Sequence, residues 1–133
     1  MNTVLLIDTD VFSFIFKEDT RAQLYEHLLI GQVLSVSFMT VAELEHWALR
    51  HNWSDDKLNR MHMFLNRFFI QPFDLSLCRV WAEVTHKARV QGHFIDGSDA
   101  WIAATALHFG IPLVTHNAKH YSMLKDLSII TKS

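Results

Sequence analysis

The sequence predicts an α/β fold with a central, mainly parallel sheet of about four to five strands. Short runs rich in valine, leucine and isoleucine alternate along the chain with longer segments whose apolar residues recur at helical spacing. Such alternation, without an internal repeat or a linker, is typical of a parallel sheet covered by helices on both faces. At 133 residues the chain can bury one substantial core, and we expect a single domain spanning residues 1–133.

Each element follows from its local pattern. The apolar runs predict strands at residues 4–7, 33–39, 70–73, 113–115 and 128–130. Helical spacing of apolar residues predicts helices at residues 20–30, 40–50, 55–69, 76–91 and 99–108. Stop signals support these ends: Gly31 and Gly92 follow the first and fourth helices, and Gly110 with Pro112 closes the last.

Composition excludes several classes of protein. Half of the residues are hydrophobic and a fifth are charged, which argues against a disordered chain. No apolar run has the length of a membrane helix, and the lone Cys78 has no partner for an internal disulfide. We therefore expect a cytoplasmic protein without a membrane role. The net charge of −2 means that a nucleic-acid partner would need a local basic face or bound metal ions.

Three acidic residues from distant parts of the chain are expected at one edge of the sheet. Asp8 ends the first apolar run, Glu43 follows the second, and Asp99 opens the alanine-rich helix. In parallel α/β sheets, ligand chemistry collects at the carboxyl ends of the strands. Carboxylate oxygens suit Mg²⁺ or Mn²⁺, ions that typically act on phosphate groups. The pattern thus predicts a metal pocket that contains these three residues.

The first two acidic segments also have structural explanations. Asp8 could cap a turn or a helix rather than serve a site. Asp10 shares a face with Asp8 only if the strand continues, and it could equally cap the next segment of the chain. Glu43 fits a capping box with Thr40, in which both side chains satisfy free amides at a helix start. The same placement would let Glu43 face the pocket.

Three residues in the second half of the chain are further candidates for the predicted pocket. Asp96 could cap the helix that contains Asp99, but two carboxylates at one helix start exceed what capping requires. We therefore favour a site role for Asp99 and keep Asp96 as an accessory residue. Thr115 and Asn117 follow a strand and could orient water or a metal ligand, although an ordinary turn would also use such residues.

Four short segments together carry a resemblance to a known family. They are LLIDTDV at residues 5–11, TVAEL at 40–44, DAWIAATA at 99–106 and GIPLVTHN at 110–117. In this order and spacing they resemble the PIN-domain family, and specifically VapC-like toxin ribonucleases of type II toxin–antitoxin systems. The resemblance covers nearly the whole chain. It implies a PIN-like α/β/α sandwich and an endoribonuclease that depends on Mg²⁺ or Mn²⁺.

The resemblance also implies roles for residues and partners. Asp8, Glu43 and Asp99 align with the acidic catalytic centre of the family, and Asp8 and Asp99 would be its principal metal ligands. Asp10 stands where the family often has asparagine. Asn117 stands in a segment where the family often has a fourth acid, so Asp10, Asp96 or a second, substrate-dependent metal would compensate. The implied partners are RNA, a small cognate antitoxin and a second copy in a homodimer.

Three alternatives remain open at the level of sequence. A haloacid-dehalogenase-like phosphatase would use Asp8 as nucleophile and Asp10 as acid and base, but no adjacent acid pair occurs after Asp56. A receiver-like signalling domain would bind Mg²⁺ in an acidic pocket, but the first strand lacks an adjacent acid pair. A catalytically weak PIN-like binding module is the third alternative, and the missing fourth acid makes it worth testing.

Overall fold

A five-stranded parallel sheet forms the centre of the computed structural model, which describes residues 3–133. The strands are β1 (Val4–Ile7), β2 (Val33–Ser37), β3 (Phe69–Gln71), β4 (Leu113–Val114) and β5 (Ile129–Ile130). Their order across the sheet is β3-β2-β1-β4-β5, and each neighbouring pair runs parallel. The predicted α/β class with a mainly parallel sheet is confirmed.

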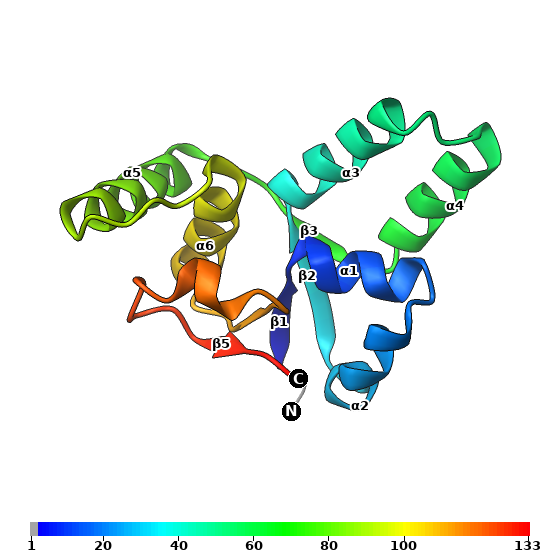
Figure 1. Ribbon diagram of the computed structural model, residues 1–133, viewed down its shortest axis with the longest axis horizontal. Coiled ribbons are helices and arrows are strands. Elements are labelled where there is room, and N and C mark those ends of the chain that lie inside the picture. Colours follow the sequence, from blue (N-terminus) through cyan, green and yellow to red (C-terminus); the bar gives the residue numbers. More distant parts are fainter. Residues whose placement is uncertain (1–2) are drawn as a thin grey trace.

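Helices cover both faces of this sheet (Figure 1). They are α1 (Thr9–Phe16), α2 (Glu26–Leu29), α3 (Phe38–Arg50), α4 (Asp55–Leu65), α5 (Leu75–Val90) and α6 (Gly97–Phe109), with 3₁₀ turns η1 (Thr20–Leu24) and η2 (Ala118–Tyr121). Side chains of β1 alternate between two apolar cores, as a strand requires. Leu6 packs with α5 and α6, whereas Leu5 and Ile7 pack with α1, α3 and α4. The result is an α/β/α sandwich.

The order of the strands places β1 at the point where the direction in which strands are added to the sheet reverses. From β1 the chain adds β2 and then β3 on one side, and β4 and then β5 on the other. Ligands of open α/β sheets bind at the carboxyl end of such a switch point. Asp8 is the first residue beyond β1, and its backbone N–H donates to the carbonyl of Val114 at 2.9 Å. The topology therefore fixes Asp8 at the centre of that edge.

The first helix differs from the prediction. No helix was expected before residue 20, but α1 begins at Thr9, directly after β1. Asp8 is its N-cap, and its carboxylate accepts from the backbone N–H of Thr9 at 2.8 Å. Val11, Phe12 and Phe14 are buried in the core on that face. Burial of this short apolar segment therefore outweighs the modest helix propensity of its aromatic and β-branched residues.

Other boundaries shift for local reasons. The helix expected at residues 20–30 is divided into η1 and α2, and the backbone of Tyr25 departs from regular helix geometry between them. The helix expected from residue 40 begins at Phe38, because Ser37 caps it by accepting from the N–H of Met39 at 3.1 Å. Within residues 3–133, no helix is long and apolar enough to cross a membrane.

Candidate active site

The carboxyl edge of the sheet contains an acidic cleft of about 240 Å³. The residues that line it come from the end of β1, from α1 and α3, from α6 with its N-cap, and from the segment after β4: Asp8, Thr9, Asp10, Glu43, Trp47, Asp96, Ser98, Asp99, Asn117 and His120. Six of the seven predicted site residues therefore line one cavity. The seventh, Thr115, is fully buried and donates to Asp8 through its Oγ1 at 2.7 Å. The expected gathering of these residues at one edge is confirmed, whereas their chemical roles stay predictions.

Asp8 is a buried carboxylate with three hydrogen-bond donors. Its Oδ1 accepts from the N–H of Thr9, and its Oδ2 accepts from Thr115 Oγ1 and from Tyr121 Oη at 2.9 Å. Burial, followed by the negative charge of Asp10, raises the pKa of Asp8 to about 7, although the three donors oppose this shift. Asp8 thus caps α1 and also lines the cleft, so the capping explanation is confirmed and a site role for this residue stays a prediction.

Asp10 lies in the first turn of α1 rather than on a continued strand. Its Oδ2 accepts from the N–H of His116 at 3.0 Å and from Nδ2 of Asn117 at 2.9 Å. Its Oδ1 accepts from the N–H of Val11 at 2.7 Å. Burial raises the pKa of Asp10, and these backbone donors oppose the shift. Asn117 therefore contacts the Asp10 carboxylate, and its expected role in orienting water or a metal ligand stays a prediction.

Glu43 occupies the second turn of α3, and the capping-box explanation for it is wrong. The helix starts two residues before Thr40, whose hydroxyl lies in the core 2.9 Å from that of Thr9. Thr9 Oγ1 donates to Glu43 Oε1 at 2.7 Å. Burial raises the pKa of Glu43, the Thr9 bond opposes this, and the charges of other cleft acids add to it. A threonine from α1 therefore holds Glu43 toward the cleft.

Asp96 and Asp99 lie near the start of α6, but one of them caps the helix and the other does not. Asp96 is the N-cap of α6 and accepts from the N–H of Ser98 at 3.0 Å. Asp99 does not cap the helix: its Oδ1 accepts from Tyr121 Oη at 3.1 Å, and its Oδ2 lies 3.3 Å from His120 Nδ1. Burial raises the pKa of Asp99, with the Tyr121 bond and the charge of His120 opposing it.

Sequence reasoning missed Tyr121, the side chain that contacts both Asp8 and Asp99. This residue is fully buried at the end of η2. Burial, and then the charges of Asp8 and Asp99, raise the pKa of its hydroxyl, which therefore stays protonated as a donor. Nothing local distinguishes its hydroxyl from that of an ordinary core tyrosine. Its four-residue separation from Asn117, a residue already predicted to lie at the edge, was the only available signal.

The cleft carries excess negative charge that suits a hard divalent cation. Four carboxylates have raised pKa values, and none of the lining residues is a lysine or an arginine. Carboxylate and amide oxygens match Mg²⁺ and Mn²⁺, and a cation would offset the repulsion that adds to burial in raising these pKa values. Among residues 3–133, no three His, Cys, Asp or Glu side chains are already arranged to share one ion. The carboxylates would therefore turn toward an incoming cation.

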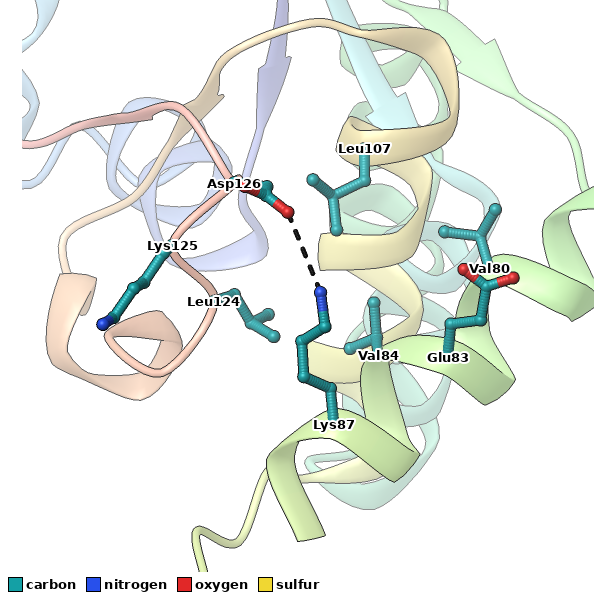
Figure 2. A pocket seen from close by; sticks show the side chains of 8 residues that line it. All are labelled: Val80, Glu83, Val84, Lys87, Leu107, Leu124, Lys125 and Asp126. Carbon is teal, nitrogen blue, oxygen red and sulfur yellow. Dashed lines mark ion pairs between the residues drawn. The ribbon is translucent and has the colours of Figure 1, made fainter. Parts of the chain in front are cut away.

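A second hollow, between α5, α6 and residues 124–126, has a different character (Figure 2). Its volume is about 270 Å³, and Val84 and Leu124 are among the apolar side chains that form its floor. Lys87 extends across the opening, and its Nζ lies 3.8 Å from Asp126 Oδ2. We call this hollow the apolar groove. It contains none of the predicted site residues.

Taken together, the fold and the cleft define a class of protein: a parallel α/β sandwich whose switch point presents clustered acids suited to hard metal ions. Comparison with known families agrees, because the PIN domain model matches residues 5–125. The chain belongs to the PIN-domain family. This membership removes the phosphatase and receiver alternatives.

Relatives of known name extend this result. The chain is 30% identical over 128 residues to "Ribonuclease VapC4" of Mycobacterium tuberculosis, covering 95% of each protein. It is 25% identical over 126 residues to "Ribonuclease VapC1" of Haemophilus influenzae, covering 93% of this chain and 94% of the relative.

Solved structures give the same fold. The toxin–antitoxin complex VapBC2 of Rickettsia felis, bound to a DNA fragment from its promoter, contains a chain that superposes with a TM-score of 0.85 at 20% identity, covering 98% of this chain and 100% of that one. FitAcB of Neisseria gonorrhoeae superposes with a TM-score of 0.78 at 26% identity, covering 96% of each chain. The expected PIN-like sandwich is confirmed.

Proposed function

We propose that this chain is an endoribonuclease that hydrolyses RNA phosphodiester bonds and is the toxin of a toxin–antitoxin pair in the cytoplasm. The observation that supports it most is the acidic cleft, where four carboxylates with raised pKa values meet without a lysine or arginine among the lining residues. The names of the VapC relatives, which match over nearly the full chain, supply the substrate class. Residues 1–133 act as a single PIN-like domain in this proposal.

Asp8 and Asp99 would hold Mg²⁺ or Mn²⁺, because both contact the Tyr121 hydroxyl and both line the cleft. When bound, the ion supplies a more acidic water and neutralises charge on the scissile phosphate. Thr115 and the Thr9 N–H orient Asp8 and favour its ionised form, against the effect of burial.

Glu43 would either share the ion or orient the attacking water. Thr9 holds its carboxylate from the side of α1, so the side chain is fixed before substrate arrives. The Glu43→Gln variant separates the two roles: a water-orienting glutamate loses cleavage but keeps the Mn²⁺ affinity of the wild type, whereas a metal ligand loses both. Asp10, held by Asn117, and Asp96 contribute charge to the cleft without a direct role in bond cleavage.

The negative charge of the acidic cleft also suits the expected antitoxin partner. We propose a small protein whose segment enters the cleft and brings a basic side chain toward the carboxylates, because opposite charges across an interface favour association. Two of the solved relatives, VapBC2 and VapBC-1, are toxin–antitoxin complexes. A homodimer of this chain is part of the proposal on the strength of the family resemblance alone.

RNA cleavage with a matched control tests the proposal. Purified wild type, Asp99→Asn and Asp126→Asn are incubated with a mixed RNA pool in Mg²⁺, Mn²⁺ or EDTA. Both changes replace an aspartate by asparagine, but Asp126 belongs to the apolar groove. We expect metal-dependent products from the wild type and from Asp126→Asn, and at least about a 100-fold loss in Asp99→Asn, since even indirect metal-site partners cost 10–100-fold. Folded wild type without cleavage in either metal would instead indicate the catalytically weak binding module.

A further inference from the structure

The two tyrosines of the chain are both fully buried, but their hydroxyls contact different groups. Tyr121 Oη lies 2.9 Å from Asp8 Oδ2 and 3.1 Å from Asp99 Oδ1. These acids come from separate elements, the end of β1 and the first turn of α6. Tyr25 Oη instead lies 2.7 Å from His116 Nδ1 and close to the backbone of Lys132. Of the two tyrosine hydroxyls, that of Tyr121 therefore contacts the acids of the cleft.

The Tyr121 hydroxyl contacts the two acids from the side of the core. Asp8 and Asp99 line the cleft, whereas Tyr121 is not among the lining residues and is fully buried. An ion that enters from the cleft would therefore meet the opposite side of each carboxylate. The hydroxyl does not occupy the entrance, so its contacts are compatible with those of an ion.

The carboxylates of Asp8 and Asp99 keep free acceptor positions for such an ion. An ionised carboxylate has about four acceptor positions. Asp8 uses at most three of them, for the Thr9 N–H, the Thr115 hydroxyl and the Tyr121 proton when that proton points to Asp8 rather than to Asp99. Asp99 accepts from the Tyr121 hydroxyl through Oδ1 and keeps its other positions for His120 and the cleft. With the core-side positions filled, the remaining lone pairs are directed toward the cleft.

One hydroxyl has a single proton, so it can donate to only one of the two carboxylates at any moment. Tyr121 therefore orients Asp8 and Asp99 without neutralising them, and their combined charge stays available to a cation. Groups that hydrogen-bond to metal-ligating carboxylates in this way fix ligand geometry, and their removal typically costs 10–100-fold in metal affinity.

We propose that Tyr121 is a positioning residue for the metal centre, whose hydroxyl keeps Asp8 and Asp99 next to each other so that one divalent ion can bind both. This inference rests on the proposed function, because it presumes that the two acids bind a metal. Removing the hydroxyl in Tyr121→Phe frees the two carboxylates to move apart. We expect the affinity for Mn²⁺ to fall about 10–100-fold. The rate at saturating metal falls less than the affinity does.

Direct Mn²⁺ binding provides the test. The free Mn²⁺ signal in electron paramagnetic resonance is titrated with wild type, Tyr121→Phe and Tyr25→Phe, and circular dichroism establishes that each variant is folded. Tyr25→Phe removes the same atom from an equally buried tyrosine that does not contact the acids. We expect weak binding in Tyr121→Phe alone. Wild-type affinity in Tyr121→Phe would overturn the positioning role, and so would an equal loss in both variants.

A second measurement does not require the Tyr121→Phe variant to fold. Protein that contains 3-fluorotyrosine has two fluorine sites, and Tyr25→Phe assigns their resonances. Titration with diamagnetic Mg²⁺ should shift the Tyr121 resonance and leave the Tyr25 resonance in place. Absence of a shift at Tyr121 while Mn²⁺ binds would refute the positioning role only. Absence of Mn²⁺ binding by folded wild type would refute the metal centre itself, and with it both proposals.

Discussion

The acidic cleft and the apolar groove have similar volumes, about 240 and 270 Å³, but they treat charge in opposite ways. In the groove, Lys87 and Asp126 are paired at the rim, where their side chains are 57% and 84% exposed. In the cleft, Asp8 is 6% exposed and shares the cavity with four other acids. The same residue type is thus solvated and paired in one region and desolvated among like charges in the other.

This difference shows which region stabilises the fold and which one reduces its stability. Apolar burial beneath the groove is favourable, and its rim charges contribute little because water screens them. Buried carboxylates without a cation cost free energy, which proteins accept mainly where function requires it. We therefore expect changes in the cleft to alter pH and metal dependence, and changes in the groove to alter stability alone.

The largest expected effect is a pH-dependent loss of stability caused by Asp8. Its pKa is about 7 in the folded protein against an ordinary 3.8, so the folded state binds more protons between these values. Stability without metal therefore falls as pH rises from about 4 through about 7, by on the order of 4 kcal/mol for this group. Urea unfolding at several pH values measures the slope. Asp8→Asn should flatten it, and Asp126→Asn should not; an unchanged slope in Asp8→Asn would contradict the assignment.

Metal binding should reverse part of that cost. At a Mn²⁺ concentration one hundred times the dissociation constant, the folded state gains about 2.7 kcal/mol. The gain should be larger at pH 8 than at pH 5, because protons compete for carboxylates whose pKa values are raised. Thermal melts with and without Mn²⁺ test this. An equal shift in a protein that carries both Asp8→Asn and Asp99→Asn would place the ion elsewhere.

Val84→Ala tests the floor of the groove. Val84 is 4% exposed and packs in the core formed with α5 and α6. Loss of its two methyl groups and the cavity left behind should cost about 2 kcal/mol of unfolding free energy. Mn²⁺ affinity, measured by the same titration used for the tyrosine variants, should stay at the wild-type value. A large loss of affinity would show that the two regions are coupled.

The smallest effect is expected at the rim of the groove. Lys87→Ala removes the exposed ion pair with Asp126, and we expect the unfolding free energy to change by less than about 0.5 kcal/mol. Urea unfolding in low and high salt measures this contribution. A loss above about 1 kcal/mol that disappears in high salt would show that the pair is stronger than its exposure implies.

The sequence could predict the cleft because its main acids follow directly from topology. Asp8 and Glu43 come shortly after consecutive parallel strands, and the carboxyl ends of such strands meet at one edge. Thr115 and Asn117 follow β4, which pairs with β1, so they reach the same edge. Only the pattern of apolar runs was needed for these placements.

Other features depend on contacts that no local pattern reveals. The segment of α1 has eight residues and is rich in aromatic and β-branched side chains, so its helix is stabilised by burial in the core. Thr40 looked like a helix cap but contacts Thr9, 31 residues earlier in the chain. Tyr121 reaches Asp8 across 113 residues. Sequence patterns describe neighbours along the chain, and these pairs become neighbours only in the folded sheet.

The same long separations determine when the cleft can form during synthesis. Asp8 is translated early, but its bonds to Thr115 and Tyr121 span 107 and 113 of the 133 residues. Domains acquire structure as the chain lengthens, and contacts that close long loops form late. A chain that is still growing therefore carries the acids of β1 and α3 without the segment that orients them. An enzyme that degrades RNA would acquire its assembled site only after Thr115 and Tyr121 have been made and have folded against Asp8.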